Sequence, residues 1–309
     1  MSNPKTLKEK MNKKGQIFTI IAILLISLMF VSFEIYSYVQ QRQAIKTRVS
    51  TMDSFLNSLE TNLERQLYIS GFRILFLAGD YIATSGNYIS DLDSLFKEGF
   101  FNGTIGGISN SILDGATYYN ITNAINTKAS KISVVVNISD TNISVSQEDP
   151  WNVKFTMITN FLMRDKQDLA RWNKTQNISV LISVVGFEDP IYTHEVGGGF
   201  SRKINQTIYE GNYVSCPTVT NLRDHVDKGY YSANTNAPSF LNRLEGNFSA
   251  DINGIESFVK SSDVPFIQDK SLIDYIYFST NNPTHSSLAG MQSWFEIDDA
   301  HKPRYSITC

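Results

Sequence analysis

The chain carries one long uncharged apolar stretch near its start. Residues 15–33 read GQIFTIIAILLISLMFVSF, Glu34 follows, and apolar character continues to Val39. A helix over residues 17–39 would be about 34 Å long at 1.5 Å per residue, which is enough to cross a bilayer. We therefore predict a transmembrane helix in this segment and the membrane as a partner.

Charge flanking this stretch predicts its orientation. Five lysines and Glu9 give residues 1–15 a net charge of +4, so that −7 remains for the rest of a chain with a total of −3. Lysines next to a membrane helix favour the cytoplasmic side. We expect everything after residue 40 to lie outside the cell. These lysines are Lys5, Lys8, Lys10, Lys13 and Lys14.

Beyond the membrane segment the apolar positions follow a helical period. Spacings of three and four residues give the stripe of an amphipathic helix, which predicts one stem helix over residues 16–70, with Gly71 as a stop or kink. A second apolar helix is expected over residues 72–82. The stripe consists of Ile45, Val49, Met52, Leu56, Leu59, Leu63 and Leu67.

From Lys131 the apolar period changes to two, which is typical of half-buried strands. We predict strands at 132–138, 142–146, 153–161 and 177–187, with a turn at Asp140-Thr141, as an antiparallel meander packed on the stem. Elsewhere the pattern predicts short helices at 93–96, 111–129, 219–228, 239–244 and 254–260, and strands at 272–279, 294–297 and 304–308. The fold class is α+β, a mostly antiparallel β head with helical insertions on a long N-terminal helix.

The junction between the lysines and the apolar stretch carries a resemblance to a known family. Lys13-Lys14-Gly15-Gln16, followed directly by Ile17-Phe18-Thr19-Ile20, resembles the class III signal peptide of archaeal type IV pilin-like proteins. The resemblance implies that a prepilin peptidase cuts between Gly15 and Gln16. Bacterial pilins carry a glutamate at the fifth mature position, and Ile20 stands there, which favours the archaeal branch.

This resemblance implies three regions: a basic leader at 1–15, a stem helix at 16–70 and an extracellular head at 71–309. Two other outcomes stay open. The chain could keep its leader as an uncleaved signal anchor, or a signal peptidase could cut after the apolar run, although residues 32–41 offer no A-x-A site.

Asparagine, serine and threonine replace much of the usual surface charge. The chain has 26 Asn and 56 Ser plus Thr, and only 18% of residues are charged. About five Asn-x-Ser/Thr sequons would arise by chance at this composition, so eight is a modest excess. All eight follow the membrane segment, and Asn137 is expected to point away from the core. They are Asn102, Asn120, Asn137, Asn142, Asn173, Asn177, Asn205 and Asn247.

Cys216 and Cys309 are the only cysteines. In an oxidising exterior the simplest expectation is a disulfide between them, which would close a loop of 94 residues, counted from 216 to 309. An intermolecular bond or free thiols are the alternatives.

Catalytic patterns are weak. His194-Glu195 lacks the second histidine of a zinc helix, and Asp298, Asp299 and His301 read as a solvated loop. Cys216 with His225 resembles a Cys–His nucleophile only in residue type. The net charge of −3 excludes a strongly basic nucleic-acid binder. We expect no enzymatic activity, no catalytic residues, no metal, no cofactor and no nucleic-acid partner.

These patterns predict a cell-surface type IV pilin-like structural or adhesion subunit, either of a filament or as a minor pilin. Its partners would be the membrane, a prepilin peptidase, and copies of itself or other pilins through the stem helix. The alternative is an uncleaved single-pass surface glycoprotein that binds a partner or a glycan.

Overall fold

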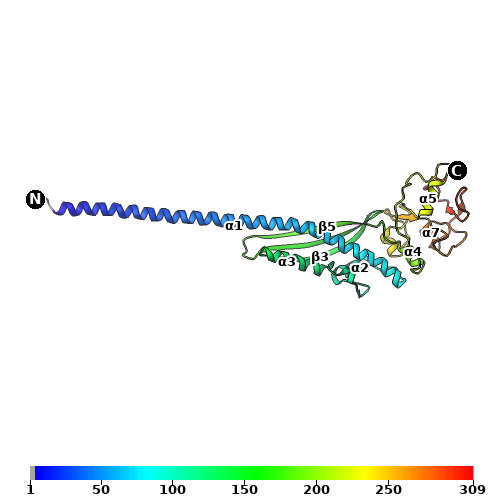
Figure 1. The fold of residues 1–309 in the computed structure, drawn as a ribbon, viewed down its shortest axis with the longest axis horizontal. Coiled ribbons are helices and arrows are strands. Elements are labelled where there is room, and N and C mark those ends of the chain that lie inside the picture. Colours follow the sequence, from blue (N-terminus) through cyan, green and yellow to red (C-terminus); the bar gives the residue numbers. More distant parts are fainter. Residues whose placement is uncertain (1–3, 309) are drawn as a thin grey trace.

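The computed structural model describes residues 4–308, with side chains from residue 15 onward. One helix, α1 (Pro4–Ser85), forms a rod of about 123 Å at 1.5 Å per residue. Its first half extends away from the rest of the chain, and its second half lies along the head (Figure 1). The expected end at residue 70 is wrong, because the helix continues through Gly71 to Ser85 without a break.

Gly71 marks the closest approach of α1 to the sheet rather than a stop. A Cβ atom at this position would lie 2.6 Å from Cδ1 of Ile182 and 2.7 Å from Cδ1 of Phe155. Both distances are shorter than van der Waals contact, so only glycine lets the helix backbone lie this close. Gly71, which the sequence suggested as a helix stop or kink, is therefore required for close packing of α1 on the sheet.

The head contains a three-stranded antiparallel sheet in the order β3 (Val134–Asp149), β4 (Asn152–Asp165) and β5 (Arg171–Ser183). This confirms the predicted antiparallel meander on the stem. The predicted turn at Asp140-Thr141 is wrong: β3 runs straight through it with a β-bulge, and Asp140 adopts φ +52°. One long strand thus replaces the two short ones.

One face of the sheet is buried under helices. Its inward residues, such as Phe155, Met157 and Ile182, pack on α1 together with α2 (Leu92–Lys97), η1 (Glu98–Asn102) and α3 (Tyr118–Lys131). A small hairpin, β1 (Thr104–Ile105) and β2 (Ile108–Ser109), and the turn η2 (Ser111–Leu113) complete this part. Helices on one face leave the other face of the sheet open.

The chain after residue 190 forms a second lobe at the end of the molecule farthest from the N-terminus (Figure 1). It has its own hydrophobic core, which includes Leu222, Phe258 and Phe295. Its elements are α4 (Pro190–Glu195), α5 (Thr220–Lys228), β6 (Tyr231–Ala233), α6 (Phe240–Leu244), β7 (Ile255–Ser257), α7 (Asp274–Tyr277), β8 (His285–Ser287) and β9 (Glu296–Asp298).

Predictions in this lobe have mixed outcomes. The helices expected at 219–228 and 239–244 are confirmed as α5 and α6. The expected helix at 254–260 is instead the strand β7, the expected strand at 272–279 holds the short helix α7, and residues 304–308 form turns and coil. Residues 254–260 and 272–279 are buried on nearly all sides, so their hydrophobic period carries no information about conformation.

Candidate functional site

The first half of α1 is apolar on every side and exposed. Phe18 and Phe30 expose 75% and 68% of their surface, and neighbours around the helix are similarly uncovered. Among the described residues α1 is the single helix long and apolar enough to cross a membrane. Gly15 and Gln16 lie exposed at the start of this run, within the helix. The side chains of the preceding lysines lie outside the described residues.

The second half of α1 buries one stripe in the head, as predicted. Met52, Leu59 and Leu63 are almost completely buried against the sheet side, while Ile45 and Val49 are half-buried at the edge. The same helix therefore changes from uniformly apolar to amphipathic along its length, which is the division that the sequence predicts.

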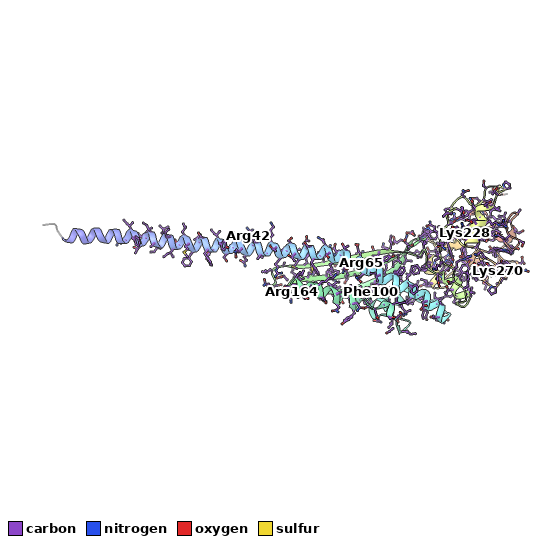
Figure 2. All side chains as sticks on the ribbon, in the orientation of Figure 1. Arg42, Arg65, Phe100, Arg164, Lys228 and Lys270 are labelled. Carbon is purple, nitrogen blue, oxygen red and sulfur yellow. The ribbon has the colours of Figure 1, made fainter. Side chains whose placement is uncertain are left out.

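Polar contacts hold the stem against the half of the sheet where β3 begins, β4 ends and β5 begins. Glu60 of α1 pairs with Lys174 of β5 at 3.1 Å and also accepts a hydrogen bond from Gln176. Arg48 donates to the carbonyl of Ile132 at 3.2 Å and lies 3.7 Å from the buried carboxylate of Asp165. Figure 2 labels Arg65 on α1 and Arg164 on the sheet strand β4.

A second row on this half of α1 is aromatic and only partly covered. Tyr68, Phe72 and Phe76 are spaced four residues apart and so share one face of the helix. Each exposes between 41% and 49% of its surface. Phe72 and Phe76 line a groove of about 550 Å³ together with Val185 and Phe187 of the segment after β5. The sequence stripe did not include this row.

Four of the sequon asparagines gather on the open face of the sheet. The strand register places Asn137 opposite Leu162 and Leu162 opposite Asn173, which makes one row across the sheet. A second row joins Asn142, Ile158 and Asn177. Residues paired in this way point to the same face. Asn137 is exposed while Val134 and Val136 are buried, as expected.

The remaining sequons differ in accessibility. Asn102, Asn205 and Asn247 are exposed in loops or at a helix end. Asn120 is half-buried in the first turn of α3, and its Oδ1 lies 2.5 Å from the hydroxyl of Thr117, the N-cap residue of that helix. Asn120 is therefore the least accessible of the eight.

Cys216 lies on the surface of the second lobe. Its Sγ is 3.7 Å from Oγ1 of Thr308, the residue before Cys309. Thr308 therefore lies next to Cys216, as the predicted disulfide with residue 309 requires. Cys309 itself lies outside the described residues, and the bond stays a prediction.

The residues considered as weak catalytic candidates form ion pairs and hydrogen bonds within the fold. His301 lies between Asp298, 2.7 Å from Nδ1, and Glu256, 3.2 Å from Nε2, whereas Asp299 is exposed and pairs with Lys302. Burial lowers the pKa of His301, but the hydrogen bonds and charges of both carboxylates outweigh burial and raise it to about 10. Asp298, Asp299 and His301 thus do not converge on one point.

His225 is fully buried and bonds to the hydroxyl of Thr207 at 2.9 Å, while Cys216 is exposed. Burial, reinforced by the charges of Arg202 and Arg304, lowers the pKa of His225 to about 3. The imidazole is a neutral core group with a partner of its own.

A buried ionic cluster centred on Arg243 holds the second lobe together, and the sequence did not reveal it. Arg243 donates to Asp189 at 2.7 Å and to Asp274 at 3.1 and 3.2 Å. All three side chains are completely buried. Tyr231 donates to Asp189, and Ser257 donates to Asp274 through both its backbone and its hydroxyl. The cluster joins the N-cap of α4 with α6, α7, β6 and β7.

Comparison with protein-family models, with curated proteins and with solved structures finds no match for this chain.

Proposed function

We propose that this chain is a membrane-anchored cell-surface subunit of the type IV pilin-like kind, with a filament-forming or adhesive role. The observation that carries the proposal is the division of α1. One unbroken helix is apolar and exposed on all sides over residues 17–39 and then buries a single stripe in its own head. A bilayer suits the first half, and a filament core of packed helices suits it equally, since both supply apolar contacts.

The aromatic row on α1 favours assembly over a solitary anchor. Tyr68, Phe72 and Phe76 lie beyond the membrane segment, on a face of the stem that its own head covers only in part. A solitary anchor leaves nearly half of each ring exposed, although Phe72 contacts Tyr68 and Phe187, whereas the stem of a second copy, packed alongside, would bury the rest. Contiguous exposed apolar surface of this kind typically marks an interaction site.

The second lobe is the part of the molecule that is positioned to contact other cells or surfaces. It lies at the opposite end of the molecule from the membrane segment (Figure 1). The sequon face of the sheet lies between the two, so glycans there would shield the side of the head and leave its tip accessible. An adhesive role would therefore belong to residues after 190.

The mature N-terminus tests the family assignment. Mass spectrometry of the protein isolated from the membranes of its own cells should show a start at Gln16, and Gly15→Val should abolish this processing. Thr19→Val keeps the apolar run and is the matched control, which should be processed normally. An intact N-terminal leader in the parent protein would contradict the pilin-like reading and favour the uncleaved single-pass alternative.

Assembly is tested separately from processing. Phe76→Ser should reduce cross-linking between copies in the membrane or in isolated filaments, while Tyr119→Ser removes a 71% exposed aromatic ring of α3 and should leave it unchanged. Equal cross-linking in both variants would exclude the aromatic row as the contact between stems.

A further inference from the structure

Three side chains that are far apart in sequence meet at the edge of the second lobe. They are His285 on β8, Glu296 on β9 and Asp269 in the loop before α7. One ligand atom from each lies within 4.8 Å of the other two. Nε2 of His285 is 3.2 Å from Oδ1 of Asp269 and 2.9 Å from Oε2 of Glu296.

The orientation of His285 directs one nitrogen at both carboxylates. Its Nδ1 lies 2.8 Å from the carbonyl oxygen of Pro283 and therefore carries a proton that it donates there. Nε2 is the atom left to face Asp269 and Glu296. A histidine whose second nitrogen donates to a backbone carbonyl is the usual arrangement of a metal-bound imidazole, because this bond fixes the tautomer and the ring plane.

A proton on Nε2 would satisfy this cluster poorly. One N–H can point well at one acceptor, and Oε2 of Glu296 is a buried atom without a hydrogen-bond partner. His301 provides the contrast within the same lobe. Its two carboxylates lie on opposite nitrogens, Asp298 at Nδ1 and Glu256 at Nε2, so that an imidazolium satisfies both. Around His285 both acceptors share one nitrogen.

We propose that Asp269, His285 and Glu296 form a binding site for a divalent transition-metal cation such as Zn²⁺. A neutral imidazole and two carboxylates balance the charge of the ion, and the separations of 2.9 and 3.2 Å from Nε2 to the two carboxylate oxygens suit metal–ligand distances of about 2.0–2.2 Å. The imidazole favours Zn²⁺ over Ca²⁺ and Mg²⁺, which prefer oxygen ligands alone.

The site has room for further ligands from solvent. The side chain of Asp269 is 92% exposed, whereas that of His285 is 11% exposed. A cavity of about 360 Å³, lined by Phe266, Trp294 and Glu296 among others, adjoins the cluster. The bound ion would tie the loop of Asp269 to the β8–β9 hairpin and so stabilise the tip of the head.

Titration of the full chain in detergent with Zn²⁺ alone tests the site. We expect one ion per chain by calorimetry, a higher melting temperature with Zn²⁺ than with a chelator, and an absorption spectrum of nitrogen–oxygen coordination on replacement by Co²⁺. His285→Ala and Glu296→Gln should each lower the affinity by at least about tenfold, since even outer-shell partners contribute that much.

The control is His194→Ala, which breaks a similar imidazole–carboxylate contact at 2.9 Å to Glu195 that lacks the third ligand. It should leave the affinity for Zn²⁺ unchanged. Circular dichroism of each variant verifies the fold. The absence of Zn²⁺ binding, equal binding by parent and both ligand variants, or tighter binding of Ca²⁺ than of Zn²⁺ would each overturn the proposal.

Discussion

Asn137 and Asn142 point to the same face of the sheet, although they are five residues apart along β3. In a regular strand, residues five apart point to opposite faces. The bulge between Ser139 and Asn142 inserts one extra residue and reverses the alternation. Thr141 in the bulge bonds to Thr159 at 2.6 Å and lies 3.1 Å from the hydroxyl of Tyr118. These contacts hold the extra residue against α3.

This arrangement predicts which sequons carry glycans. The exposed side chains of Asn137, Asn142, Asn173 and Asn177 should be occupied in protein from its own cells, and Asn120 should be unmodified because it is half-buried and bonded to Thr117. Glycopeptide mass spectrometry provides the measurement. Asn137→Gln should remove one glycan, and Asn120→Gln should leave the glycan mass as it is. A glycan on Asn120 with none on the sheet face would contradict this prediction.

Gly71→Ala should destabilise the head. The new Cβ would lie 2.6 Å from Ile182 and 2.7 Å from Phe155, and overpacking of this kind costs about 1–3 kcal/mol. Gly79→Ala in the same helix is the matched control, because no atom lies within 4 Å of its Cβ position. It should stabilise by about 0.5–1 kcal/mol through helix propensity alone. Denaturant unfolding of both variants measures the difference, and equal effects would disprove close packing at Gly71.

Arg243→Met should be among the most damaging substitutions. It would leave Asp189 and Asp274 buried without their cationic partner, and breaking a buried ion pair costs about 3–5 kcal/mol. Arg223→Met on the exposed side of α5 should stay within about 0.5 kcal/mol of the parent. Denaturant unfolding measures both variants. If the unfolding midpoint shifts as little in Arg243→Met as in Arg223→Met, the cluster contributes little to stability.

His225 should make the protein less stable in acid. Its pKa is lowered to about 3 by burial, so below pH 6.5 the unfolded chain binds a proton that the folded chain does not accept. Stability attributable to this group is therefore lost as the pH falls from about 6.5 toward 3. His225→Gln keeps a polar group near Thr207 and should flatten the acid side of the profile of melting temperature against pH. An unchanged slope would contradict the assignment.

His301 should have the opposite effect in base. Its pKa is raised to about 10, so the protonated form stabilises the fold below pH 6.5 and this contribution is lost as the pH rises toward 10. His301→Gln should lower stability near pH 6 and converge on the parent near pH 10. A constant difference between the two proteins across this range would show that packing, not charge, accounts for the effect.

The sequence by itself determined the elements that depend on neighbouring residues. The apolar run over 17–39 and the stripe from Met52 to Leu67 follow from local hydrophobic periodicity, and the structure confirms a continuous helix with these two halves. The alternation after Lys131 likewise predicts the antiparallel meander. These features need no knowledge of distant contacts, because each segment carries its own apolar face.

Only the tertiary structure decided features that join distant residues. Gly71 reads as a helix breaker until Phe155 and Ile182 are placed above it, and Asp140-Thr141 reads as a turn until Thr159 opposes it in the register. The cluster of Asp269, His285 and Glu296 has no sequence spacing that would reveal it. Such sites depend on how the backbone packs at long range, and a local hydrophobic pattern does not record those distances.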